Sequence, residues 1–226
     1  MSQQQRRPWI VGVSGASGTP FAASVLRGLL DAGESVDLVV SRASRLTLLD
    51  ETGIAFRDAH WREDLRSWLA RGADGKPDTF AVEGGALERV RHWAAGDLAA
   101  GPSSGSYPAK GMLIVPASTA CVAGVALGLS KDLLQRAASV TLKERRTLVV
   151  AVRETPLSGQ TLKQMVALDE AGAVVLPASP AFYAGATHIQ DLVDFVAGRV
   201  LDAAGVPHRL YRRWEGELGG GSRERA

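Results

Sequence analysis

A charged pair stands directly after an apolar run, where a purely structural strand needs no charge. The run is 147–152, and Arg153 and Glu154 follow it. Such a pair is either a structural ion pair or a phosphate clamp with an acid–base partner beside it. At this point the sequence leaves both interpretations open.

Three further cations lie at the edges of apolar helix faces. Arg136 and Lys143 are seven residues apart in one predicted helix, so their side chains nearly superpose along it. Arg199 lies on or beside the apolar stripe of a second predicted helix. One such cation is usually a snorkelling side chain, whereas three together with Arg153 favour a site for an anion with several oxygens.

Small and hydroxyl-bearing residues follow two other apolar runs. Residues 14–18 (SGASG) come after the run 9–13, and residues 116–120 (PASTA) come after 111–115. Such turns let a ligand approach backbone N–H groups at the start of a helix, although a tight turn or a Ser/Thr cap explains them equally well. The glycines do not have the dinucleotide-binding spacing, and the chain holds no P-loop motif.

The elements that must position these residues alternate between strand and helix. Apolar runs predict strands at 9–13, 35–40, 111–115, 147–152 and 173–176. Amphipathic patterns predict helices at 20–32, 119–127, 131–145, 161–171 and 189–204. Short continuous apolar strands separated by helices predict a doubly wound, Rossmann-like α/β fold with a mostly parallel sheet covered on both faces. Such folds bind ligands at the carboxyl ends of the strands, where both turns and Arg153 lie.

The chain is expected to form one domain over 9–218. The polar ends 1–8 and 219–226 are predicted to be disordered tails, because they lack apolar stripes. Residues 53–101 carry three of the five tryptophans and are predicted to form an inserted helical lobe with its own apolar face.

Composition argues against several classes of protein. In 226 residues, 26 Lys and Arg balance 24 Asp and Glu, and a net charge of +2 gives no case for a nucleic-acid binder. No apolar run approaches the length of a membrane span, and no secretory core is found near the start, so we expect a cytoplasmic protein without membrane contact. Cys121 is the only cysteine, which excludes an internal disulfide, and the four histidines lack metal-ligand spacing. We expect Cys121 to be a buried helix residue and no nucleophile.

Taken in order, these residues resemble the UbiX-type flavin prenyltransferases (the UbiX/Pad family, formerly called aromatic acid decarboxylases). The resemblance spans nearly the whole chain outside the tails and residues 53–101. The segments that carry it are GVSGASG (12–18), VVSRAS (39–44), SSGSYPAKGMLIVPAST (103–119), RAASVTLKERRTLVV (136–150), RETPLS (153–158), PASPAFY (177–183), DLVDFVAGRVLD (191–202) and RRW (212–214). Because LKERR and RETPLS stand together, the combination is far more specific than the glycine turn alone.

The resemblance implies a single flavoprotein domain that transfers the dimethylallyl group of dimethylallyl monophosphate to N5 and then C6 of reduced FMN, without a metal. The product, prenylated FMN, would serve a UbiD-type decarboxylase. The resemblance also implies a homo-oligomer, taken as a dodecamer, with active sites where subunits meet. Phosphate is the leaving group, so cations are needed to stabilise its growing charge.

The resemblance also implies roles residue by residue. Those for FMN binding are Gly15, Ala16, Ser17, Ser41, Ser118, Thr119, Ala120, Cys121 and Arg153. Those for binding the prenyl phosphate are Ser104, Gly105, Arg136, Lys143, Glu154, Tyr183 and Arg199. Those for catalysis are Glu154, Lys143, Glu51, Ser17 and Trp214, whose ring can stabilise an allylic cation, and no residue is assigned to a metal.

Two alternatives remain. A non-catalytic FMN-binding accessory subunit of a decarboxylase needs the flavin contacts, but it does not need Lys143, Glu154 and Arg199 together. A relative of the FMN-dependent cysteine decarboxylases relies on a catalytic histidine and an Asn in a P-x-M-N segment, whereas this chain has PAST at 116–119 and no histidine nearby. Departures from the family pattern at Ser103 and at 184–186 leave the mono- or diphosphate donor and the subunit contacts open.

Overall fold

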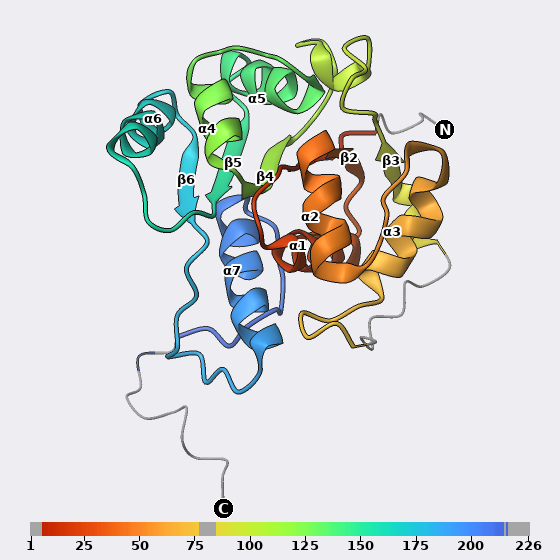
Figure 1. Ribbon diagram of the computed structural model, residues 1–226, viewed down its shortest axis with the longest axis vertical. Helices are drawn as coiled ribbons and strands as arrows, with labels where there is room; N and C mark the ends of the chain where they lie inside the picture. Colours follow the sequence, from red (N-terminus) through yellow and green to blue (C-terminus); the bar gives the residue numbers. More distant parts are fainter. Residues whose placement is uncertain (1–5, 77–84, 215, 217–226) are drawn as a thin grey trace, which may run out of the picture.

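The computed structural model describes residues 6–76, 85–214 and 216 (Figure 1). Its strands form one sheet in the order β3-β2-β1-β4-β5-β6, and every neighbouring pair is parallel. Their bounds are β1 Trp9–Val13, β2 Val36–Val40, β3 Val90–His92, β4 Gly111–Ala117, β5 Thr147–Val152 and β6 Val174–Pro177. The predicted doubly wound α/β fold is therefore confirmed.

Helices follow the strands, as the alternating pattern predicts. Their bounds are α1 Thr19–Asp31, α2 Arg42–Thr52, α3 Trp61–Leu69, α4 Thr119–Ala126, α5 Leu133–Lys143, α6 Gly159–Glu170 and α7 Ile189–Ala203. Short 3-10 turns occur at Asp58–His60, Ala86–Arg89 and Gly101–Ser103. In Figure 1, α3 and β3 lie at one end of the sheet, and α6 and β6 lie at the other.

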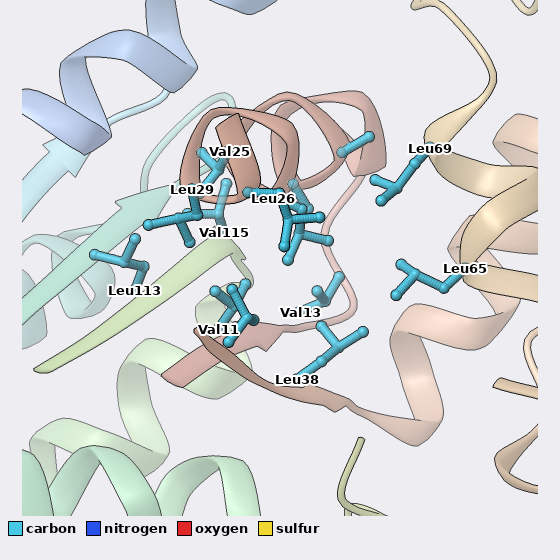
Figure 2. Close-up of a cluster of buried hydrophobic side chains, with 14 of the residues drawn as sticks. Val11, Val13, Val25, Leu26, Leu29, Leu38, Leu65, Leu69, Leu113 and Val115 are labelled. Carbon is cyan, nitrogen blue, oxygen red and sulfur yellow. The ribbon is translucent and has the colours of Figure 1, made fainter. Parts of the chain in front are cut away.

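Alternating strand residues divide the core into two layers, because successive side chains of a strand point to opposite faces. Val11, Leu113 and Val115 pack with leucines and valines of α1, α3 and α7, as Figure 2 shows in part. Ile10, Met112 and Ile114 pack on the other face, against α4 and α5. Both faces of the sheet are thus covered, which explains the unbroken apolar strands.

The order of the strands reverses between β1 and β4. From β1 the chain adds β2 and β3 on one side, and it then returns to place β4, β5 and β6 on the other. The turns that follow β1 and β4 therefore lie next to each other at the carboxyl edge of the sheet. In open α/β sheets such a switch point is where ligands bind.

The stretch 53–101 differs from the expected helical lobe. It supplies the edge strand β3, which pairs with β2, and Leu65, Trp68 and Leu69 of α3 are buried in the main core instead of on an apolar face of their own. A three-residue strand is too short to produce a recognisable apolar pattern.

The start of the chain also differs from expectation where it is described. Arg6 forms an ion pair with Asp37 at 2.5 Å, and it donates to the carbonyls of Val36 and Arg89. Residue 6 is therefore anchored to the sheet, because the buried Asp37 carboxylate needs a cation. The predicted tails at 1–5 and 219–226 lie outside the described residues. Within the described ranges, no helix is both long and apolar enough to cross a membrane.

Candidate active site

Two serine side chains connect the turns after β1 and β4. The Ser14 hydroxyl donates to the carbonyl of Pro116 at 2.8 Å and accepts from the backbone N–H of Ser118 at 2.7 Å. The Ser118 hydroxyl then caps α4 by accepting from the N–H of Cys121. Thr119 and Ala120 follow on the accessible first turn of that helix. Ser118 is therefore a helix cap, which is one of the interpretations that the sequence allows. The turn still presents backbone amide groups at the switch point of the sheet.

The glycine turn after β1 packs closely on the start of α2. A Cβ added to Gly15 would lie 2.5 Å from the Cβ of Ala43, so no larger residue fits there. Ser41 caps α2, since its hydroxyl accepts from the N–H of Ser44 at 3.1 Å. Gly18 has φ +113°, a backbone conformation that favours glycine. The close approach therefore brings Ala16 and Ser17 to the same edge as Ser41.

A carboxylate already occupies the N-terminus of α1. Glu51 Oε1 accepts from the N–H of Gly18 at 2.8 Å, and Oε2 accepts from the N–H and the hydroxyl of Thr19 at 2.8 and 2.6 Å. Burial raises the pKa of the Glu51 carboxyl, but hydrogen bonds from Ser17, Thr19 and Gly18 outweigh this effect, so the pKa lies below 4.5. The first amide groups of α1 thus bind Glu51 and are already satisfied by a negative charge of the same chain.

The charged pair after β5 does not form an ion pair with itself. Arg153 Nε donates to the carbonyl of Ser17 at 2.9 Å, which ties the end of β5 to the glycine turn. Glu154 is exposed, and its Oε1 accepts from the N–H of Thr155 at 2.9 Å. Of the two interpretations that the sequence leaves open, the geometry favours the clamp.

Arg153 lies between two cavities at this edge. A cavity of about 460 Å³ has a polar side formed by Ser17, Glu51 and Arg153, and an apolar side that includes Phe21 and Leu192. A second cavity, of about 380 Å³, is lined by Arg153, Glu154, Met165 and Pro177 among others. Polar groups on one side and apolar groups on the other suit a ligand with an anionic end and a hydrophobic body.

A second group of predicted site residues surrounds the loop before β4. Lys143, at the end of α5, forms an ion pair with Glu144, and a Cβ added to Gly105 would lie 2.6 Å from the Lys143 Nζ. Ser104, beside Gly105, shares a hydrogen bond with the Ser106 hydroxyl at 2.9 Å. The structure thus brings Ser104 and Gly105 to Lys143, as the resemblance implies for one pocket.

Arginines hold this loop by its backbone. Arg136 Nε donates to the carbonyl of Ser103 at 3.0 Å. Arg146 donates to the carbonyls of Tyr107 and Gly105 at 2.8 and 2.7 Å. Arg146 could not be singled out from the sequence, because its role depends on two carbonyls about 40 residues earlier in the chain.

This loop group lies at the opposite edge of the sheet from Arg153. Lys143 comes four residues before β5 begins, whereas Arg153 follows the end of β5. A six-residue strand spans about 20 Å, so the two cations of one chain are separated by roughly the height of the sheet. One chain therefore does not bring Lys143 to Ser17, Arg153 and Glu154.

A third group lies on α7 and the segment that follows it. Arg199 Nη1 donates to Asp202 Oδ2 at 2.9 Å, and Arg199 lines a cavity of about 460 Å³. The ring of Tyr183 packs edge-on against that of Trp214, with centroids 6.0 Å apart. Pro177 and Ser179 line this cavity and also the one beside Glu154, so the two cavities adjoin.

Cys121 is a buried helix residue, as predicted. It is 5% exposed, and burial together with the charge of Asp132 raises the pKa of its thiol to about 12. A protonated thiol is a poor nucleophile, and the backbone N–H of Cys121 already donates to the Ser118 hydroxyl. Within the described ranges, no cluster of His, Cys, Asp and Glu side chains could hold a metal ion.

Comparison with known proteins identifies relatives over nearly the whole chain. Residues 1–201 match the family model described as Flavoprotein. The flavin prenyltransferase UbiX of Streptomyces coelicolor is 85% identical over 213 residues, which cover 94% of this chain and 97% of that protein.

Solved structures of similar proteins share the fold over nearly the whole chain. A structure of AnUbiX (PadA1) in complex with FMN and dimethylallyl pyrophosphate has a TM-score of 0.76 and 33% identity, and covers 94% of this chain and 100% of that one. A dodecameric FMN-dependent UbiX-like decarboxylase from Escherichia coli O157:H7 has a TM-score of 0.77 and 33% identity, and covers 92% of this chain and 100% of that one.

Proposed function

Because this chain belongs to the flavoprotein family, and within it to the UbiX flavin prenyltransferases, we propose that the carboxyl edge of its sheet binds FMN and that cations from three regions bind the prenyl phosphate. The enzyme joins a dimethylallyl group to FMN, which is its substrate and prenyl acceptor. A bond forms from the prenyl carbon to flavin N5 as the carbon–oxygen bond to phosphate breaks and N5 loses its proton. Protonation of the prenyl double bond then allows closure onto C6, which loses its own proton and completes a fourth ring.

The arrangement of donors supports an FMN phosphate at the starts of α2 and α4. Glu51 takes the first amide groups of α1, whereas the first turn of α4 is accessible at Thr119 and Ala120. Ser41 and Arg153 add a hydroxyl and a guanidinium at the same edge. Gly15 and Ala16 keep this edge narrow, and the N–H of Cys121 completes the turn. Helix N-termini and guanidinium groups are the usual partners of phosphate oxygens.

In this proposal, the positive charge for the departing phosphate comes from Lys143, Arg136 and Arg199. The negative charge of the phosphate grows as the carbon–oxygen bond breaks, so cations placed there lower the barrier. Glu154 is the acid–base group, since its carboxylate is accessible and lies next to Arg153 on the cavity wall. Tyr183 and Trp214 provide aromatic faces for the allylic cation.

A second copy of the chain is needed to complete each site in this arrangement. Lys143 and Arg153 lie at opposite edges of one sheet, so they meet only if Lys143 comes from a neighbour. Exposed apolar side chains on α6 and β6, at Leu162, Val166 and Val174, favour such association. We propose a homo-oligomer, and a dodecamer is the form of the Escherichia coli relative.

Mixing two variants tests the shared site. At an FMN concentration near the wild-type Kd, Lys143→Ala is expected to lose prenyl transfer and Arg153→Ala is expected to lose most of its bound FMN. Each variant alone is then nearly inactive, and co-assembly is expected to restore up to about a quarter of the sites. The restored sites take an intact Lys143 from one copy and an intact Arg153 from another. No recovery in oligomers shown to contain both variants contradicts the proposal.

One observation carries the proposed ligand set. Arg153 bonds to a backbone carbonyl, forms no ion pair with any carboxylate of the described residues, and lies beside a cavity with one polar and one apolar side. The protein is incubated anaerobically with reduced FMN and dimethylallyl monophosphate, without added metal, and the released flavin is weighed by mass spectrometry. We expect a flavin heavier by one five-carbon prenyl unit. Unmodified FMN with both this donor and the diphosphate contradicts the assignment and favours the accessory-subunit alternative.

We further propose that the product serves a UbiD-type decarboxylase and that the enzyme works in the cytoplasm. A buried single cysteine is typical of a reducing compartment. Adding the reaction product to a UbiD-type apo-decarboxylase tests the first point. Activity that depends on the prenylated flavin is expected, and equal activity with FMN alone contradicts it.

A further inference from the structure

One carboxylate on α7 gathers four hydrogen-bond donors. Asp202 Oδ2 accepts from Arg199 Nη1 at 2.9 Å and from the Tyr211 hydroxyl at 2.5 Å. Asp202 Oδ1 accepts from Arg213 at 2.7 Å, and His208 Nε2 lies 3.0 Å from it. Three of these four donors belong to the segment after the end of α7. Asp202 therefore fastens that segment back onto its own helix.

The contact between this segment and α7 is close. A Cβ added to Gly198 would lie 2.5 Å from ring atoms of Tyr211 and 2.7 Å from the ring of His208. The His208 side chain is only 1% exposed. Its Nδ1 accepts from the N–H of Leu210, so its Nε2 carries the proton and donates to Asp202 in the neutral ring. The carboxylate, the histidine and the glycine fix one path for the chain after α7.

A row of aromatic rings connects Asp202 to Trp214. The ring of Tyr211, which bonds Asp202, lies 4.9 Å from that of Phe195 on α7. Phe195 packs edge-on against Tyr183 at 5.7 Å, and Tyr183 packs against Trp214 at 6.0 Å. The position of both proposed active-site aromatics thus depends on the segment that Asp202 holds.

The Arg199 guanidinium is hydrogen-bonded to the described residues on one side only. Among the described residues, both of its hydrogen bonds, to Asp202 and to the Tyr211 hydroxyl at 3.4 Å, use Nη1. Nε and Nη2 remain for a ligand in the cavity that Arg199 lines. Arg213 and Arg199 together carry two positive charges against the single negative charge of Asp202, so the cluster remains cationic and suits a phosphate.

From this geometry we propose that Asp202 is a positioning residue for the prenyl-phosphate part of the site. It orients Arg199 with one side of its guanidinium toward the phosphate, and it holds the segment that carries Trp214. This inference rests on the proposed function, because it assumes that Arg199 and Trp214 face the prenyl phosphate. Partial burial would raise the pKa of Asp202, but hydrogen bonds from Arg213, Tyr211 and His208 outweigh it and lower the pKa to about 2, so the carboxylate stays charged at any working pH.

The test compares Asp202→Asn with the wild-type enzyme. The amide keeps the size of the side chain, but it carries no charge and replaces one acceptor oxygen with a donor. Either Arg199 and Tyr211 at Oδ2 or Arg213 and His208 at Oδ1 therefore lose their acceptor, and Arg199 loses its ion pair in both cases. We expect KM for dimethylallyl monophosphate to rise about tenfold, kcat to fall less, and FMN affinity to stay within about twofold. Asp169→Asn, an exposed carboxylate on α6, is the matched control and is expected to change none of these values.

A second readout does not depend on turnover. The emission of Trp214, isolated by subtracting that of the Trp214→Phe variant, is expected to shift to longer wavelength in Asp202→Asn, because the released ring meets more water. An unchanged or lowered KM overturns the role of Asp202 toward Arg199. A raised KM with unchanged emission overturns its role toward Trp214.

Failure of the proposed function gives a different result. In that case the wild-type enzyme transfers no prenyl group to FMN, whereas the emission of Trp214 still responds to Asp202→Asn. Tyr211→Phe removes one donor and keeps the ring, so its shift in emission is expected to be smaller than that of Asp202→Asn. An equal or larger shift would overturn Asp202 as the centre of this contact.

Discussion

The two edges of the sheet hold their functional side chains in different ways. At the carboxyl edge, Ser41, Ser118 and Glu51 each bond to the backbone at a helix start, and Arg153 bonds to the carbonyl of Ser17. At the opposite edge, the Lys143 side chain is 51% exposed and pairs only with its neighbour Glu144 among the described residues. The first edge is organised by its own chain, whereas the second presents a cation outward.

This difference fits a division of work between copies of the chain. Side-chain caps at a helix start contribute about 1 kcal/mol each and cannot exchange partners without that loss. An exposed ion pair such as Lys143–Glu144 contributes little, so Lys143 can leave Glu144 for a phosphate at small cost. The edge proposed to bind FMN is therefore organised by its own chain, and the exposed Lys143 matches its proposed role in a site on a neighbour.

Removing the Lys143 side chain is expected to have the largest effect on prenyl transfer. Lys143→Ala should lower kcat/KM for prenyl transfer by about 100-fold or more, because a cation that stabilises a leaving phosphate contributes about 3 kcal/mol. FMN affinity should not change, since the proposal assigns Lys143 of the neighbouring copy to the prenyl phosphate and not to FMN. Steady-state turnover and FMN titration measure the two quantities.

Lys131→Ala is the matched control, since Lys131 is exposed and precedes the same helix. It should leave both quantities unchanged. Retained turnover in Lys143→Ala would contradict the role given to the outward cation.

Removing Arg153 should show the opposite pattern. Arg153→Ala is expected to weaken FMN binding by about 10- to 100-fold, because hydrogen bonds to charged groups contribute about 1.5–3 kcal/mol. The glycine turn also loses its tie to β5 through the Ser17 carbonyl. Titration of the apoprotein with FMN checks this, with the exposed Arg66→Ala on α3 as control. Unchanged FMN affinity would remove Arg153 from the FMN site.

The carboxyl edge could be predicted from the sequence because the parallel-sheet pattern determines it. Short apolar strands with intervening helices place residues 14–18, 116–120 and Arg153 at one edge, whatever the details of packing. The short edge strand β3 left no such pattern, because three residues have too little periodicity to be recognised.

Contacts between distant residues could not be predicted in the same way. Glu51 reaches the start of α1 from the last turn of α2, 33 residues away, and no periodicity relates the two positions. The contacts of Asp202 depend on the direction that the chain takes after α7. The distance between Lys143 and Arg153 within one chain follows from the direction of β5 in the sheet. The family resemblance assigns both residues to one active site, but it does not say which copy of the chain supplies each residue.

A substitution of Arg146 tests the edge of the sheet opposite to Arg153, where the strands begin. Arg146→Ala should raise KM for the prenyl phosphate about threefold to tenfold, because losing two hydrogen bonds to the carbonyls of Gly105 and Tyr107 loosens the loop beside Lys143. FMN affinity should stay constant. Arg146→Lys retains one donor position and should recover part of the effect. An unchanged KM in Arg146→Ala would show that the loop is held without this residue.

The smallest expected effect concerns the cap at the carboxyl edge. Both oxygens of Glu51 accept from backbone N–H groups, whereas glutamine offers one acceptor oxygen. Glu51→Gln should therefore lower the free energy of unfolding by about 1 kcal/mol at pH 7. Because the pKa of Glu51 is lower in the folded state, the stabilisation is present above about pH 4.5 and is lost as the pH falls through the folded pKa.

Denaturant unfolding at a series of pH values measures this difference. The two proteins should converge in stability as the pH falls well below 4.5, because protonation removes the charge that the amide groups of α1 bind. Glu170→Gln, at an exposed position on α6, should match the wild type throughout. If the free energies of unfolding of the wild type and Glu51→Gln still differ by the same amount in acid, Glu51 stabilises the turn by packing and not by charge. The contrast between the two edges, which includes a charged cap at the start of α1, would then weaken.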